Sequence, residues 1–204
     1  DGTMIWQQPI VLYNSLGSHY CFDGIALANN EFMFSWIHSS NGNFEIYAHK
    51  MDINGNILWQ NPTIIYTTVQ SLIFGTFNDQ TIIPTSDNGA IIAWVDDGLI
   101  SGYKDLFAQK VSAEGNCLWG NNAIRMAQCV GDEISLAPDS NGGCYISWTD
   151  TNNYDIFGQH QSVWHLDLLL KLQLPHLVQV NALNTVHALP AHAPDFCAWM
   201  HWHS

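Results

Sequence analysis

The chain has 204 residues, 47% of them hydrophobic and nine of them Trp, so it can bury a sizeable core and is not a disordered polymer. Five basic residues against 18 acidic ones give a formal charge of −13. Binding to nucleic acid or to an anionic membrane surface needs clustered Lys and Arg, so neither is an expected partner. No apolar run is long enough to span a membrane as a helix.

In chain order, the sequence predicts a set of short segments that recurs. A turn-and-strand segment at 1–6 comes first, followed by strands at 31–38 and 45–51 and a second turn-and-strand segment at 54–59. Strands at 81–85, 89–96 and 105–111 and a third turn-and-strand segment at 114–119 follow. The last predicted strands are at 133–138, 143–150 and 155–161. The Trp residues of the middle strands, Trp36, Trp94 and Trp148, lie 58 and 54 residues apart. Several segments that return in the same order are the signature of a repeat protein.

The turn chemistry indicates how these strands connect. Asn54-Gly55 is a strong hairpin signal, because both central residues of a type I′ turn need positive φ. We therefore expect the strand at 45–51 to turn there into an outermost strand that contains Trp59. The result is an all-β fold of β-propeller-type, four-stranded antiparallel blades, with three clear units. A sandwich would show regular turns too, but not ordered self-similarity.

The recurring string also resembles a β-propeller repeat of many bacterial secreted and cell-surface proteins, over residues 1–161. It is carried by Tyr47-Ala48-His49-Lys50, Phe107-Ala108-Gln109-Lys110, Asn54-Gly55-Asn56, Gly142-Gly143 and the three middle-strand Trp residues. The resemblance implies an extracellular or cell-surface scaffold or binding module without catalytic activity.

The remaining residues, 162–204, form a divergent fourth unit in our interpretation. Trp202 lies 54 residues after Trp148, and Ala193-Pro194-Asp195 repeats Ala137-Pro138-Asp139. The alternative is an atypical tail of foreign sequence. A strand at 3–12 could complete the last blade of a ring within the chain; otherwise two chains close a larger ring, or the chain belongs to a longer protein. We expect self-association or a missing remainder.

Candidate binding residues come from the aromatic and acidic positions. Trp36, Trp94 and Trp148 are expected to pack between blades. Trp6, Trp59 and Trp119, on the predicted outer strands, are the candidate glycan contacts, and Asp96 and Asp150, which follow the middle-strand Trp at the same offset, are candidate ligand contacts.

Neither a catalytic residue nor a cofactor is predicted. His192, His201 and His203 lack a closing set of carboxylates or thiols, so no metal site is predicted either. The five Cys include no CxxC pair, and the sequence assigns no disulfide among them.

These residues and their spacing leave three functional hypotheses. The first is a non-catalytic extracellular module for protein interaction or self-association, and the second is a glycan-binding propeller. The third and weakest is a hydrolase with a carboxylate pair in the central channel, because glycosidases work with two acidic residues about 5–10 Å apart.

Overall fold

The computed structural model describes residues 6–68, 77–96, 104–128, 130–150 and 154–162. Within these ranges the protein is all-β, with no helix and therefore no helical membrane span. The described strands are β1 (Ser18–Ala26), β2 (Glu31–Ser40), β3 (Asn43–Asp52), β4 (Thr63–Thr68), β5 (Phe77–Pro84), β6 (Ala90–Asp96), β7 (Asp105–Val111), β8 (Ile124–Gln128), β9 (Val130–Pro138), β10 (Cys144–Asp150) and β11 (Ile156–Gln161).

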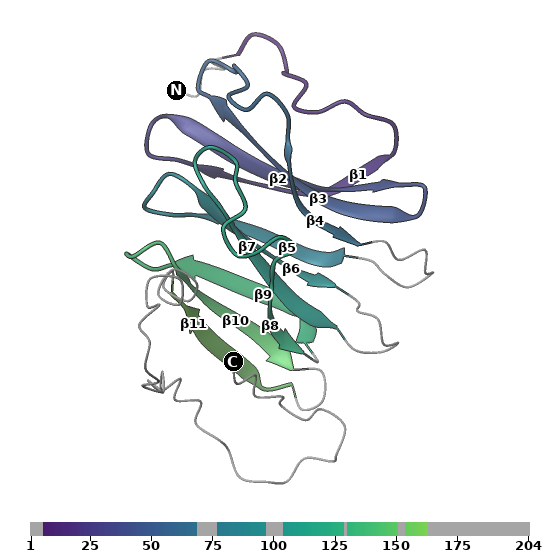
Figure 1. The fold of residues 1–204 in the computed structure, drawn as a ribbon, viewed down its shortest axis with the longest axis vertical. Helices are drawn as coiled ribbons and strands as arrows, with labels where there is room; N and C mark the ends of the chain where they lie inside the picture. Colours follow the sequence, from purple (N-terminus) through teal and green to yellow (C-terminus); the bar gives the residue numbers. More distant parts are fainter. Residues whose placement is uncertain (1–5, 69–76, 97–103, 129, 151–153, 163–204) are drawn as a thin grey trace, which may run out of the picture. The chain divides into compact units, whose positions relative to one another are not determined.

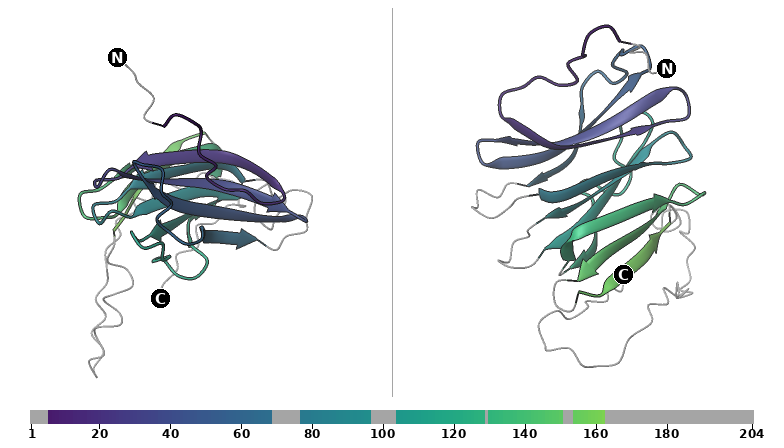
Figure 2. Two further views of the ribbon diagram at one scale, coloured as in Figure 1. Left: turned by 90° about the horizontal axis from the view of Figure 1, so that it is seen from above. Right: turned by 180° about the vertical axis from the view of Figure 1, so that it is seen from behind.

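These strands form three antiparallel sheets, which we call repeats 1, 2 and 3 (Figure 1). Repeat 1 has the order β1-β2-β3-β4, repeat 2 the order β5-β6-β7-β8, and repeat 3 the order β9-β10-β11. The sheets follow one another in chain order (Figure 2), and β5 lies against both β1 and β9. The all-β prediction is confirmed. A closed propeller is not, because the sheets described do not close into a ring.

Strand register makes the three repeats equivalent residue by residue. Side chains alternate between the two faces of a strand, so each sheet has two distinct faces. One face, the Trp face, carries the middle-strand Trp: Trp36, Trp94 or Trp148. The other, the small-residue face, has small residues paired at its centre: Ser35 with Ala48, Ala93 with Ala108, and Ser147 with Gly158.

The Trp face of each repeat packs on the small-residue face of the repeat before it. Trp94 is fully buried in a cluster that includes Ala48 of repeat 1. Trp148, 4% exposed, lies in a second cluster with Ala93 and Ala108 of repeat 2. Small side chains leave room for an indole ring, which explains why the two faces fit. The prediction that these two Trp residues pack between neighbouring units is confirmed.

The predicted reversal of the chain at Asn54-Gly55 occurs, but its turn type and the strand that follows differ from the prediction. Only Gly55 of this pair has positive φ, at 87°. The carboxylate of Asp52 accepts the backbone amides of Asn54 and Asn56 at 2.9 and 2.8 Å and closes a tight loop. After the loop, Ile57 bridges back to Met51 of β3, but the outer strand is β4, so Trp59 precedes that strand instead of lying in it.

The residues before β1 also differ from the prediction. Residues 6–17 contain no strand, so a strand at 3–12 is wrong for the part that is described. Their apolar side chains instead cover the Trp face of repeat 1, where Trp36 is 1% exposed: Trp6, Ile10, Leu12 and Tyr13.

The predicted fourth unit, residues 162–204, lies outside the described residues apart from Ser162.

Candidate functional site: the open face of repeat 3

At two junctions between successive segments, a Trp residue donates an indole hydrogen bond to the next segment. The indole Nε1 of Trp59 donates to the carbonyl of Ala113 in the next repeat at 3.0 Å, and Trp6 donates to Ile53 at 2.9 Å. Ala113 and Ile53 occupy the same place in their loops. The ring of Trp59 is only 8% exposed, because it packs on the loop that it hydrogen-bonds.

These positions correct part of the glycan prediction. Trp59 and Trp119 are 8% and 5% exposed, so neither presents an open ring on which a sugar could stack. Trp6 is partly buried against repeat 1 and uses its indole N–H within the chain. In this structure Trp59 and Trp119 lie at the junctions between repeats, and Trp6 holds the N-terminal segment on repeat 1.

Buried Lys residues form a second link across the junctions. Lys110 Nζ, whose side chain is 2% exposed, lies 2.8 Å from the carboxylate of Asp87 in its own repeat. It also donates to the carbonyl of Gly142 in repeat 3 at 3.0 Å. Lys50 does the same between repeats 1 and 2, with Glu31 as the acidic partner at 2.7 Å. Each Lys ammonium group therefore has one partner in its own repeat and one in the next repeat.

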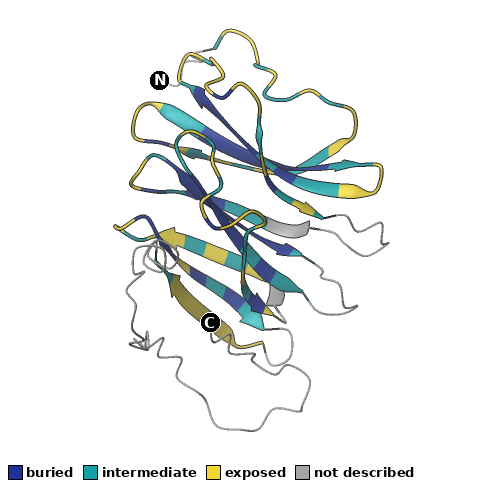
Figure 3. Cartoon of the chain, in the orientation of Figure 1, coloured by how far each residue is buried: buried dark blue, intermediate teal, exposed yellow. Residues whose placement is uncertain are grey.

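Repeat 3 leaves uncovered the face that repeats 1 and 2 bury. Tyr145 is 54% exposed and Ile156 is 80% exposed, whereas the equivalent residues of repeat 2, Ile91 and Leu106, are both fully buried. Figure 3 shows the contrast, since β11 is largely exposed while β6 and β7 of repeat 2 are largely buried. We call this surface the open face; it is the small-residue face of repeat 3.

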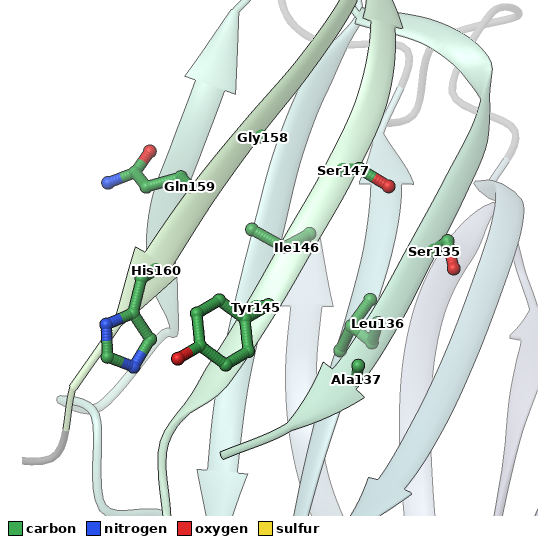
Figure 4. A pocket seen from close by; sticks show the side chains of 9 residues that line it. All are labelled: Ser135, Leu136, Ala137, Tyr145, Ile146, Ser147, Gly158, Gln159 and His160. Carbon is green, nitrogen blue, oxygen red and sulfur yellow. The ribbon is translucent and has the colours of Figure 1, made fainter.

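A shallow depression of about 380 Å³ occupies the middle of the open face (Figure 4). Ser135 lines it, and its floor includes Ser147 and Gly158, which are equivalent to the small residues paired at the centre of this face in the other repeats. At one end the ring of Tyr145 stacks on that of His160, with centroids 4.4 Å apart. The depression therefore lies where the pattern of the repeats places the Trp of a following sheet.

A hydrogen bond between a His and an Asp side chain borders the open face at the position of the buried Lys residues. His160 is equivalent to Lys50 and Lys110, and its Nε2 lies 2.7 Å from the carboxylate of Asp139. The hydrogen bond to His160 lowers the pKa of Asp139, and the backbone amides of Asn141 and Gly143 lower it further. An acidic partner is thus present, at the position of Thr85 and not of Asp87, and the imidazole is 43% exposed.

The two predicted acidic contacts lie at the opposite end of the middle strands from the Lys residues. Asp96 accepts a hydrogen bond from the hydroxyl of Tyr66 at 3.1 Å and lies directly opposite Asp105 on β7. Burial raises the pKa of Asp105, the charge of Asp96 adds to the rise, and the neighbouring Arg125 opposes it. Asp96 therefore belongs to a small polar cluster at the edge of repeat 2.

Asp150 takes the equivalent place in repeat 3, where it belongs to a turn. Its backbone amide donates to the carbonyl of Asp155 at 3.0 Å, and its carbonyl accepts the amide of Tyr154 at 3.1 Å. The structure does not bring Asp96 and Asp150 into one site, because they belong to different sheets. In the described residues, no three His, Cys, Asp or Glu side chains are arranged to hold a metal ion.

The residues of the open face were not selected from the sequence. A signal for them exists, because aligning the repeats puts Tyr145 at the position of Ile91, and Gly158 and His160 at those of Ala108 and Lys110. Repeat 3 is thus more polar and less filled than its neighbours at the positions that become interfaces. This difference identifies an exposed interface only when it is known which face of each strand contacts the next sheet.

Comparison with known proteins gave little similarity. Neither the protein-family models nor the curated proteins contained a match to this sequence. Among solved structures, the chain is similar to the endo-arabinase from Bacteroides thetaiotaomicron VPI-5482, with a TM-score of 0.48 and 12% identity over 78% of this chain. The match covers 62% of that enzyme's chain, so this chain spans less than two thirds of its length.

This neighbour contradicts one prediction. The sequence was interpreted as that of a non-enzymatic protein, and the structural neighbour is an enzyme. We withdraw the prediction that catalysis is absent. At this level of similarity, however, the neighbour's activity is not carried over to the chain.

Proposed function

We propose that the chain is a propeller-type repeat module that binds a further β-sheet through the open face of repeat 3. The observation that carries the proposal is the exposure of Tyr145 and Ile156 at positions that are fully buried in repeats 1 and 2. Exposed apolar residues gathered on one face are typical of an interaction surface. The depression over Ser147 and Gly158 adds shape, because it matches the place where an indole packs in the other repeats.

The edge of the sheet supports the same proposal. β11 pairs with β10 on one side, and on the other side no described strand pairs with it, whereas β3 and β7 each have an outer neighbour. An unpaired strand edge is a template for another chain. The resemblance to bacterial secreted repeats supports an extracellular or cell-surface location for this interaction.

A substitution at the floor of the depression tests the proposal. We expect the native chain to associate in a concentration-dependent manner, and Ser147→Arg to remain at the monomer mass of 22.9 kDa, because a long charged side chain fills the depression. Multi-angle light scattering over a range of concentrations measures this. Ser140→Arg, in the exposed turn before β10, is the control and should behave as the native chain. A native chain that stays monomeric at every concentration would contradict the proposal.

A second candidate function is glycan hydrolysis, and one observation favours it. Asp96 and Asp105 lie directly opposite each other, which separates their Cβ atoms by about 4.5–5.5 Å. Retaining glycosidases hold two carboxyl groups about 5–5.5 Å apart, one of them with a raised pKa as the acid. Asp105, whose pKa is raised, would be that acid and Asp96 the nucleophile. The first strands of the sheets, β1, β5 and β9, are the ones that contact one another, and this pair lies on β6 and β7 instead. It therefore differs from the central-channel pair expected from the sequence.

Release of reducing sugar from a panel of polysaccharides, arabinan among them, tests this second candidate. Activity in the native chain should fall at least about 100-fold in Asp96→Asn and Asp105→Asn, because each substitution removes an acid–base or nucleophilic group. Asp155→Asn, the equivalent of Asp105 in repeat 3, is the matched control. The candidate fails if no polysaccharide is cleaved or if the control loses activity equally.

A further inference from the structure

The segment before β1 repeats the outer strand of repeat 1 and its approach. Residues 6–15, WQQPIVLYNS, match residues 59–68, WQNPTIIYTT, without a gap. Residues 63–68 of the second string are β4 itself. The match therefore assigns to residues 10–15 the sequence of an outer strand.

Three contacts show that the two segments also sit alike on the repeat that follows each. The first is the pair of indole hydrogen bonds from Trp6 and Trp59 to equivalent loop carbonyls. In the second, Tyr13 lies 4.9 Å from Trp36 and Tyr66 lies 5.1 Å from Trp94, measured between ring centroids.

The third contact is made at the loop glycines. A Cβ on Gly55 would meet Ile10 and Trp6, and a Cβ on Gly115 would meet Thr63 and Trp59. Residues 6–15 therefore cover repeat 1 as the outer segment of repeat 1 covers repeat 2.

One difference remains between the two segments. β4 pairs with β3 while it covers repeat 2, whereas residues 10–15 cover repeat 1 without pairing to any described strand. Repeat 3 shows the converse, because β11 has no described strand on its outer side. Among the described residues, the chain thus contains an outer-strand sequence that pairs with no strand and a sheet whose last strand has no outer neighbour.

We propose that residues 10–15 of one copy pair with β11 of a second copy as its fourth strand, and that two copies joined reciprocally in this way close a ring of six repeats. The proposal rests on the proposed function and names its partner as a second copy of this chain. By the register of β3 with β4, Val11 lies opposite Phe157, and Tyr13 opposite Ile156. Six repeats fall within the roughly four to eight blades of known propellers.

The faces that meet in this arrangement are complementary. Residues 10–15, which already cover Trp36, would approach the open face of the second copy together with the Trp face of repeat 1. Phe22, 67% exposed on β1, adds an exposed apolar side chain to repeat 1.

A matched pair of substitutions in the full chain tests the proposal. Ile156 and Val11 are 80% and 74% exposed, but their equivalents differ: Leu106 is fully buried, whereas Ile64 remains 48% exposed within paired β4. We expect the native chain and Val11→Lys to sediment as a dimer. Ile156→Lys should weaken dimerisation by at least about 100-fold, because it places a charge at a buried position. Equal behaviour of the two variants would overturn the proposal.

Hydrogen exchange of the native chain provides a second, independent readout. Amides of residues 10–15 and of β11 should gain protection together as the concentration rises through the dimer range, because each strand becomes the other's partner. Protection of β11 without residues 10–15 would overturn this pairing while leaving the open face as an interaction surface. Association into open-ended multimers would overturn the closed ring. A chain that is monomeric throughout would contradict the proposed function itself.

Discussion

Replacing Trp94 with Ala is expected to lower the free energy of unfolding by about 3–5 kcal/mol, as for other buried aromatic residues. Trp94 is fully buried between repeats 1 and 2, with Tyr66 at 5.1 Å and Phe107 at 6.1 Å between ring centroids. Removing the ring leaves a cavity that spans the junction, and two packed sheets cannot collapse into it completely. Urea unfolding followed by circular dichroism measures the loss.

Two further variants show that the effect arises from packing. Trp94→Phe should lose much less, because the indole N–H of Trp94 has no protein partner among the described residues and Phe retains most of the contact. Leu16→Ala, at a site that is 91% exposed, should leave stability nearly unchanged. If Trp94→Phe were as damaging as Trp94→Ala, packing of the ring would not be the reason.

The sequence predicted the repeat because its signals are local. Strand alternation, the recurring Trp and the Asn-Gly pairs are all determined by neighbouring residues, and these correctly indicated an all-β chain of antiparallel sheets. The outer strands were misplaced because NGNILW carries the strongest turn signal in the repeat. The type I′ turn with two positive φ angles occurs instead at Asn41-Gly42, between β2 and β3. At Asn54-Gly55 the Asp52 carboxylate selects a different loop.

The open face could not be found by the same reasoning. Whether Tyr145 or Ile156 is buried depends on the sheet stacked against it, and that sheet is remote in sequence or lies in another chain. The same limit applies to Trp59, a predicted glycan contact in an outer strand, which is buried by the next repeat. Alternation within a strand indicates which residues share a face, but not what that face contacts.

Replacing Trp59 with Ala is expected to have the second large effect, also about 3–5 kcal/mol, for a partly different reason. Trp59 is 8% exposed and spans the junction as Trp94 does, but its N–H donates to the carbonyl of Ala113. Trp59→Phe should therefore lose about 0.5–1.5 kcal/mol for that hydrogen bond in addition to the lost contact. Urea unfolding of the two Ala and two Phe variants measures both contributions.

The comparison between the two Trp sites decides whether Trp59 is a directional link between repeats. At each site, the loss of unfolding free energy in the Phe variant can be divided by the loss in the Ala variant. This ratio should be larger at Trp59 than at Trp94, because of the two only Trp59 donates its indole N–H to a described residue. Equal ratios would mean that the bond to Ala113 contributes nothing and that Trp59 acts as apolar filling alone. If the expected order holds, Trp6 should act in the same way on Ile53, and a second copy would receive repeat 1 with its N-terminal segment already held in place.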